Sequence, residues 1–214
     1  VLNWGSLPKI IKYTNDTSKA KFLRSYVQTY VKEEIVAEQL VRNLAPFRMF
    51  LPIAAQMNAK TLNFSNIAKD TGVDHKTVQT YFEILTETYM GSFLDAYSGS
   101  KRKVQIQAPK FYFFDLGVQR ALLKQLTVPV VPETNTYGEA FETWFINECR
   151  ALNIYNDLDF KFSYLRTKDD VEIDLIVVRP DRSEVLVKIK SATHLDERHI
   201  KHLRLMKKDF PKAQ

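Results

Sequence analysis

The sequence is poor in residues that cross-link a chain or hold it in a membrane. Among its 214 residues Cys149 is the single cysteine, so no disulfide can form within the chain. This favours a reducing, cytoplasmic compartment. The 4 histidines are scattered and lack the spacing of a metal site. No apolar run reaches the length of a membrane span and no signal peptide opens the chain, so we expect no membrane partner.

The phosphate-binding motif G-x-x-x-x-G-K-[ST] is also missing. We therefore expect these residues neither to bind ATP tightly nor to hydrolyse it. The chain begins at Val1 without a methionine, and its last residues, PKAQ, directly follow a predicted helix. We interpret the sequence as a fragment of a longer protein.

The composition is that of a folded protein with a mild positive charge. Hydrophobic residues make up 45% of the chain and aromatic residues 12%, which argues against disorder. The formal net charge of +6 permits a nucleic-acid partner without requiring one. The length suits two modest domains or one large domain.

The N-terminal part is predicted to be mainly helical. Residues 1–15 have few periodic signals and are expected to be extended. Apolar residues at helical spacing predict a helix from Thr17, which Asp16 or Thr17 itself can cap. A second helix is expected from Pro46, with a kink or a delayed start caused by Pro52.

Residues 61–88 have the pattern of a helix-turn-helix. Ser65 is expected to cap a short helix, Gly72 to turn the chain, and Asp74 to cap a longer helix. The exposed positions of the longer helix are expected to be His75, Lys76, Gln79 and Thr80.

Two strands are predicted after this motif, at residues 89–97 and 110–114. The basic loop between them holds Lys101, Arg102 and Lys103 and resembles the wing of a winged helix. One interpretation is binding to double-stranded DNA, with Lys76 and Gln79 at the major groove and the loop on phosphates. The alternative is packing against protein, because acidic Glu83 and Glu87 weaken the positive face of the helix.

A Val- and Pro-rich linker at residues 127–136 predicts a domain boundary. We expect a helical and winged-helix domain over residues 1–130, with its core at 46–114, and an α/β domain over 131–214. The second domain should open with an amphipathic helix from Tyr137 whose apolar side carries Phe141, Trp144, Phe145 and Cys149. A basic helix starting at Asp196 or Glu197 should close it.

Residues 171–190 are predicted to form a hairpin that turns at Pro180–Asp181. By alternation, Glu172 and Asp174 share one face of the first strand, and Val171, Ile173 and Leu175 share the other. Lys188 and Lys190 share a face of the second strand. We expect the ammonium group of Lys188 to lie within salt-bridge reach of Asp174 or Glu172.

This hairpin resembles the core of the PD-(D/E)xK nuclease-like superfamily. The resemblance implies a restriction-endonuclease-like fold in which Asp174 is the central aspartate and Lys190 the catalytic lysine. Glu142 would be the acidic residue of the leading helix and, with Asp174, a ligand of Mg²⁺; Glu139 matches this role less well. The superfamily has an acidic residue where this chain has Lys188. That lysine neutralises the charged face, which favours cross-strand ion pairs over a metal site.

The whole chain resembles the C-terminal half of prokaryotic AAA-type ATPases. The resemblance rests on GSLPKIIKY, SYVQTYVKEEI, APKFYFFDLGVQRALL, GEAFETWFINE and FSYLRTKDDVEIDLIV, in that order along the chain. It implies an ATP-binding domain outside this sequence and a possible oligomer. The leading hypothesis is a DNA-binding or nucleic-acid-sensing region with an impaired nuclease-like site. The alternatives are an active Mg²⁺-dependent nuclease and a docking module of the ATPase.

Overall fold

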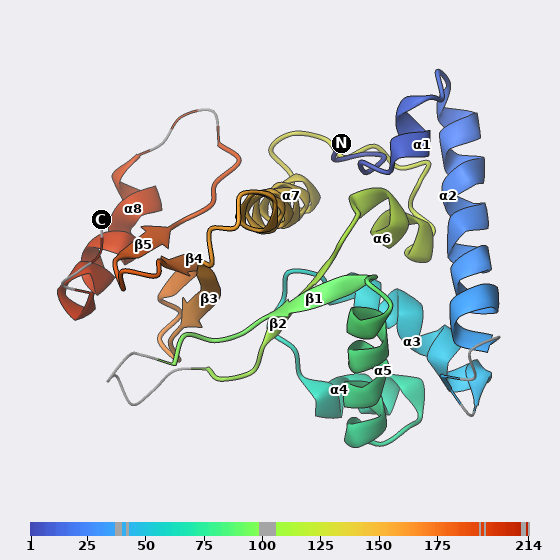
Figure 1. The fold of residues 1–214 in the computed structure, drawn as a ribbon, viewed down its shortest axis with the longest axis horizontal. Coiled ribbons are helices and arrows are strands. Elements are labelled where there is room, and N and C mark those ends of the chain that lie inside the picture. Colours follow the sequence, from blue (N-terminus) through green and yellow to red (C-terminus); the bar gives the residue numbers. More distant parts are fainter. Residues whose placement is uncertain are drawn as a thin grey trace.

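The protein is a mixed α+β structure (Figure 1), as predicted. The computed structural model describes residues 1–36, 40–41, 43–98, 106–192, 194, 196–210 and 213. The helical elements are α1 (Pro8–Ile11), α2 (Asp16–Tyr30), the π-helix η1 (Val31–Val36), α3 (Leu44–Gln56), α4 (Phe64–Thr71), α5 (His75–Glu87), α6 (Leu116–Leu122), α7 (Asn135–Tyr155), α8 (Glu197–Met206) and the 3₁₀-helix η2 (Lys207–Asp209). The strands are β1 (Gly91–Leu94), β2 (Lys110–Phe113), β3 (Lys161–Arg166), β4 (Glu172–Val178) and β5 (Glu184–Val187).

A single aromatic core joins the helices of the N-terminal half to the β1–β2 pair. Phe50 of α3, Phe82 of α5 and Phe111 of β2 are fully buried in it. The Phe82 ring lies 4.9 Å from the Phe50 ring and 5.0 Å from the Phe111 ring, edge to face in both cases. This is a favourable geometry for aromatic pairs. The packing fixes α5 on the small sheet, with its polar side outward.

The helix-turn-helix is present, although one of its caps differs from the prediction. Gly72 adopts the left-handed conformation with φ of 69° and ends α4, as a turn glycine should. Asp74 caps α5 by accepting hydrogen bonds from the main-chain nitrogen atoms of Lys76 and Thr77. The predicted cap at Ser65 is wrong, because α4 begins at Phe64 and the cap is Asn63, two residues earlier, which accepts a hydrogen bond from the main-chain nitrogen of Asn66.

Other helix starts also differ from the prediction: α3 begins at Leu44 rather than Pro46, and α7 at Asn135 rather than Tyr137. Asn15, rather than Asp16 or Thr17, caps α2 by accepting a hydrogen bond from the main-chain nitrogen of Ser18. Residues 1–15 are not extended throughout, because they include α1. An asparagine amide oxygen and an aspartate carboxylate accept hydrogen bonds from the free N–H groups of the first turn about equally well. Sequence rules that act over a few residues therefore do not distinguish neighbouring cap candidates.

The N-terminal segment is fastened to the start of α6 through a buried carboxylate. Asp115 is 2% exposed and accepts hydrogen bonds from the main-chain nitrogen atoms of Ser6, at 2.6 Å, and Val118, at 2.9 Å. Gly5 has a φ of 74°, and a Cβ atom there would lie 2.1 Å from the Asp115 carboxylate. Only glycine fits this position. The Gly-Ser pair near the start and the Asp-Leu-Gly run at 115–117 are therefore two halves of one contact.

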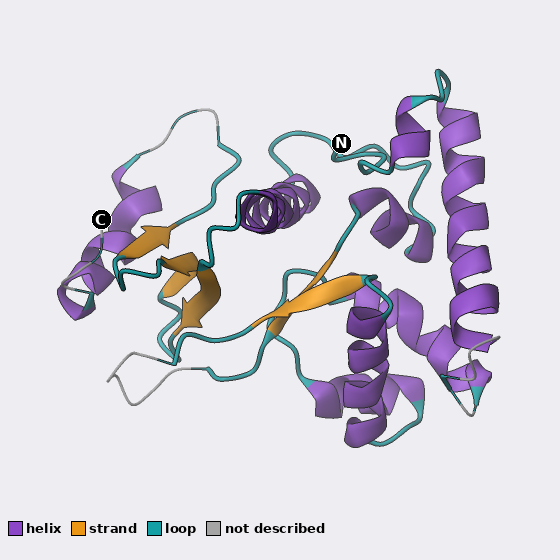
Figure 2. Ribbon diagram, viewed as in Figure 1, coloured by secondary structure: helices purple, strands orange, loops and turns teal. Residues whose placement is uncertain are grey.

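The C-terminal part contains a three-stranded antiparallel sheet of order β3-β4-β5 (Figure 2). Figure 1 shows α7 end-on between this sheet and α6. The turn at Pro180–Asp181 is present, as predicted. The second strand is shorter than predicted, because β5 ends at Val187, before both lysines.

The predicted division of β4 into one apolar face and one charged face is wrong at Leu175. The β3–β4 register shifts by one residue, so that Leu165 pairs with Ile173 while Ser163 pairs with Ile176. An extra residue in one strand turns the following side chains to the opposite face. Leu175 consequently joins the cluster that contains Ile146 of α7, and Ile173 joins a different cluster with Met206 of α8. Beyond this bulge β4 carries apolar side chains on both faces.

The three-stranded sheet and the β1–β2 pair share a hydrophobic cluster. Leu94 of β1, Tyr112 of β2 and Ile146 of α7 are packed in it together with Tyr164 of β3. The main-chain nitrogen of Tyr164 also donates to the carbonyl oxygen of Asp95 at 3.0 Å. Side chains from both predicted domains therefore build this cluster, which holds Tyr112 of β2 and Leu175 of β4 together.

Candidate functional site

Five charged side chains from four parts of the chain form a connected network. Glu142 comes from α7, Glu172 and Asp174 from β4, Lys110 from β2, and Lys188 from the segment after β5. The network alternates acid and base in the order Glu142, Lys110, Glu172, Lys188, Asp174. Glu142, Glu172, Asp174 and Lys188 were expected at the predicted site; Lys110 was not, and its position helps to decide what the site can do.

Lys188 contacts the central aspartate, as predicted. Its Nζ atom lies 2.6 Å from Oδ1 of Asp174 and 3.6 Å from Oε2 of Glu172. The second oxygen of Asp174 accepts a hydrogen bond from the main-chain nitrogen of Ile189 at 2.6 Å. The Asp174 carboxylate thus accepts a main-chain N–H two residues after β5 ends at Val187. Asp174 is 3% exposed, so the pair is buried rather than half-exposed as the hairpin alone suggested.

Lys110 is the residue of the site that sequence reasoning missed. It is 3% exposed, and its Nζ atom lies 3.1 Å from Oε1 of Glu142 and 3.0 Å from Oε1 of Glu172. Two residues further along β2, the hydroxyl of Tyr112 donates to the same Glu142 oxygen at 2.6 Å. The alternation of β2, which places Lys110 and Tyr112 on one face, is the only sequence signal for this pair.

Burial and neighbouring charge act against each other in the network. Burial raises the pKa of Asp174 despite the opposing ammonium group of Lys188. Burial would also raise the pKa of Glu172, but the ammonium groups of Lys110 and Lys188 together lower it. Burial would lower the pKa of Lys110, yet Glu142 and Glu172 raise it. Glu172, which contacts both lysines, is therefore held in its charged form more firmly than Asp174.

This difference predicts a pH-dependent effect of Glu172→Gln. Because the pKa of Glu172 is lowered in the folded state, its charge stabilises the fold above the unfolded value of about 4.3. That stabilisation is lost as the pH falls through the lower folded-state pKa. We expect the native chain to exceed the variant in free energy of unfolding by about 2 kcal/mol at pH 7, as for other hydrogen bonds to charged groups.

Urea unfolding between pH 3 and pH 7 measures this difference. The matched control is Glu148→Gln, which changes an exposed glutamate of α7 and should have no such pH dependence. If the native chain exceeds Glu172→Gln in free energy of unfolding by as much at pH 3 as at pH 7, the charge of Glu172 is not what stabilises the fold.

The network does not suit the Mg²⁺ ion that the nuclease-like resemblance implies. Both oxygens of Asp174 are already occupied, and the Oε1 atom of Glu142 accepts from both Lys110 and Tyr112. Three carboxylates with two ammonium groups leave a single formal negative charge, too little to favour a divalent cation. Within the described part of the chain no group of three or more His, Cys, Asp or Glu side chains has a metal-binding arrangement.

Lys190 is not part of the ion-pair network, but it lines the same groove as Glu142, which is. It is exposed and, with Glu142 and Ile189, lines a groove of about 800 Å³ beside the N-terminal end of α7. Glu139 also lines this groove and lies 3.6 Å from the Nζ atom of Lys60. The structure thus brings Glu142 and Lys190 to one groove, while Lys188 occupies the position between Glu172 and Asp174.

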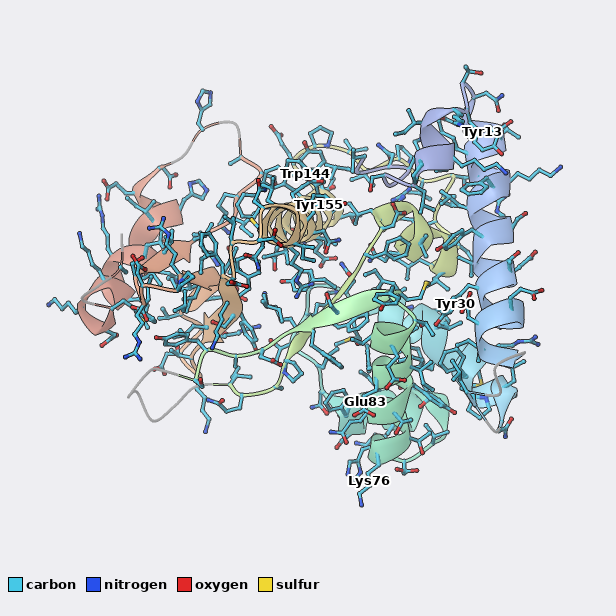
Figure 3. All side chains as sticks on the ribbon, viewed as in Figure 1. Tyr13, Tyr30, Lys76, Glu83, Trp144 and Tyr155 are labelled. Atoms are coloured by element: carbon cyan, nitrogen blue, oxygen red, sulfur yellow. The ribbon has the colours of Figure 1, made fainter. Side chains whose placement is uncertain are left out.

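The helix-turn-helix presents a separate polar surface. Its residues His75, Lys76, Gln79 and Thr80 are all exposed on α5, as predicted. Figure 3 shows Lys76 pointing outward at the end of α5 that lies farthest from the sheet, and Glu83 further along the same helix. The other three predicted phosphate contacts, Lys101, Arg102 and Lys103, lie outside the described residues.

The basic residues of α8 are partly used within the fold. Arg204 forms a bidentate ion pair with Glu197, and Nδ1 of His202 accepts a hydrogen bond from the main-chain nitrogen of Glu172 at 3.2 Å. These contacts remove part of the free positive charge that the sequence suggested for this helix. Among the described helices none has the length and apolar character needed to cross a membrane.

Comparison with known proteins identifies the family of the N-terminal part. Residues 1–127, more than half of the chain, match the domain of unknown function DUF8612. The chain belongs to the DUF8612 family. Residues 137–214 match a second domain of unknown function, DUF4143. The gap between the two matches coincides with the linker before α7, and the ion-pair network joins β2 of the DUF8612 part to α7 and β4 of the DUF4143 part.

Two curated mycobacterial proteins are similar to this DUF8612 chain. They are the uncharacterized protein Rv2008c of Mycobacterium tuberculosis and the uncharacterized protein Mb2031c of Mycobacterium bovis. Each is 22% identical over 173 residues, which cover 81% of this chain and 38% of the relative. The chain thus spans less than half the length of these relatives. No solved structure matches it significantly.

Proposed function

We propose that this chain is a DNA-binding region of a cytoplasmic AAA-type ATPase, with a restriction-endonuclease-like domain that does not cleave. The observation that carries the proposal is the exposed face of α5, where an Asp74-capped helix presents His75, Lys76, Gln79 and Thr80 free of internal packing. In helix-turn-helix proteins the N-terminal residues of the second helix contact base edges in the major groove.

Further features support this assignment. The antiparallel pair β1–β2 follows α5 directly and has the position of a wing, so a duplex on α5 would also meet the loop between these strands. The helix α7 followed by β3, β4 and β5 matches the element order expected of a nuclease-like core. The greater length of the mycobacterial relatives leaves room for an ATP-binding domain, which would be the first partner of this region.

Salt-dependent binding to a DNA duplex tests the proposal. The slope of log affinity against log salt is about 0.9 for each phosphate neutralised. Lys76→Gln should therefore weaken binding to DNA duplexes of any sequence and reduce the slope by about 1. Fluorescence anisotropy of a labelled duplex at several salt concentrations measures both quantities.

The matched control is Lys12→Gln, which removes the same charge from the exposed lysine that ends α1. Figure 1 shows α1 near the top of the view and α5 near the bottom. It should leave the slope unchanged. Absence of binding at low salt, or equal effects of the two variants, contradicts DNA binding by α5. The chain would then be better explained as a docking module of the ATPase.

An active Mg²⁺-dependent nuclease is the second candidate, because Glu142 and Lys190 line one groove. We regard Lys188 and Lys110 as the reason for inactivity, since each places an ammonium group between two carboxylates. Metal titration of Lys188 variants, described in the Discussion, separates the two candidates.

A further inference from the structure

A pocket with a buried cation lies between α3, α6 and α7, and no residue of the ion-pair network or of the α5 surface lines it. Its volume is about 270 Å³, close to the lower end of the range for small-molecule sites. Arg120 of α6 lines it and is 5% exposed. Around the pocket, the lining residues Gln56, Lys60, Gln125 and Thr136 are polar and exposed. The pocket is thus a hollow with an open polar rim and a cationic interior.

The charge of Arg120 has no acidic counterpart in the described structure. Its Nε atom donates to the carbonyl oxygen of Asn3 at 3.0 Å, and Nη2 donates to the carbonyl oxygens of Gln125, at 2.7 Å, and Val128. These neutral acceptors satisfy N–H groups but do not neutralise the guanidinium. Among the described residues no carboxylate lies within ion-pair distance of it, and Nη1 has no hydrogen-bond partner. Buried charges are normally paired.

Two other arginines differ from Arg120 in having an acidic group that favours their charged form. The Arg166 guanidinium pairs with Asp170 at 2.9 Å, which raises its pKa. Burial lowers the pKa of Arg150, but Tyr112 and Asp95 oppose that change. At Arg120 burial lowers the pKa and no acidic group opposes it.

The balance of charge around the pocket is positive. Lys60 and Arg120 contribute two cations, and Glu139 contributes one anion that lies 3.6 Å from Lys60. An anionic group inside the pocket would meet the Arg120 side chain, which lines it, and could also approach Lys60. A cation or an apolar molecule would leave the Arg120 charge unpaired.

We infer that this pocket binds a small oxyanion ligand, carrying one carboxylate or one phosphoryl group, through Arg120 and Lys60. The pocket is lined by residues from both sides of the linker before α7, so the ligand would join the DUF8612 part to the start of the DUF4143 part. The inference is independent of DNA binding, because Lys76 and the α5 surface take no part in it.

Calorimetric titration of the full chain with sodium phosphate and, separately, with sodium acetate tests this site at constant ionic strength. We expect saturable binding of one of them with a Kd of about 1 mM or below. Binding of phosphate alone identifies a phosphoryl ligand, and binding of acetate alone a carboxylate ligand. Lys60→Glu should weaken binding at least ~10-fold, because it replaces an attraction by a repulsion at the rim.

Lys161→Glu is the matched control, since it makes the same charge change at an exposed lysine of β3 and should leave the Kd unchanged. Arg120→Lys should abolish measurable binding if the chain remains folded by circular dichroism. If the Arg120→Lys variant is unfolded, the Kd of the Lys60→Glu variant provides the test instead. No binding of either anion at 20 mM, or equal binding by the native chain and Lys60→Glu, overturns the inference. Phosphate binding that Lys76→Gln weakens and Lys60→Glu does not would place the anion on α5 and would also overturn it.

Discussion

Lys110→Met should lower the free energy of unfolding by about 3 kcal/mol. Removing one partner of a buried ion pair costs about 3–5 kcal/mol, since the remaining charge is left without compensation. We expect the lower end of this range because the side chains of Glu142 and Glu172 keep 21% and 24% of their exposure. Urea unfolding at pH 7 measures the loss.

A second variant separates lost charge pairing from lost packing. The triple variant combines Lys110→Met with Glu142→Gln and Glu172→Gln. It leaves no uncompensated carboxylate beside position 110, so most of the lost stability should return. Lys161→Met, at an exposed lysine, should change stability by about 0.5 kcal/mol or less. If the triple variant is no more stable than Lys110→Met alone, the network is not what holds β2 against α7 and β4.

Lys188→Glu should convert the network into a metal-binding site. In the native chain Mg²⁺ would approach the ammonium group that lies 2.6 Å from Asp174. At an effective dielectric of about 20, two unit charges 4 Å apart interact by roughly 4 kcal/mol, and a divalent ion doubles the repulsion. Even strong solvent screening leaves an expected gain of at least ~10-fold in Mg²⁺ affinity, equivalent to about 1.4 kcal/mol, when the lysine becomes glutamate.

Thermal unfolding in EDTA and in Mg²⁺ gives a direct measurement. Lys188→Glu should be less stable than the native chain in EDTA, because four carboxylates then share the network with a single ammonium group, and Mg²⁺ should raise its unfolding midpoint. Lys188→Met, which removes the ammonium group without adding an acid, should show little response to Mg²⁺. The combination Lys188→Glu, Asp174→Ala should lose the response. Tight Mg²⁺ binding by the native chain, equal to that of Lys188→Glu, would refute the impaired-site interpretation and favour an active nuclease.

Local patterns were sufficient for much of the fold. The helix-turn-helix follows from an acidic cap at Asp74, a turn glycine at Gly72 and apolar spacing, each of which acts within a few residues. The Asp174–Lys188 contact also follows from the sequence, because the turn at Pro180–Asp181 fixes which residues of the hairpin lie opposite each other. The neighbouring cap candidates at 15–17 and 63–65 were harder to separate, since several polar side chains can satisfy the same N–H groups.

The sequence by itself therefore determined the α+β class, the helix-turn-helix and the lysine opposite the central aspartate. Only the tertiary structure decided that Lys110 pairs with Glu142, which is 32 residues away, and that Arg120 lines a pocket with no ion-paired carboxylate among the residues that the structure describes. It also decided the bulge in β4, which moves Leu175 to the face of α7. Periodicity and capping act over one or two turns of chain, whereas the partner of a buried charge is set by which distant elements pack together.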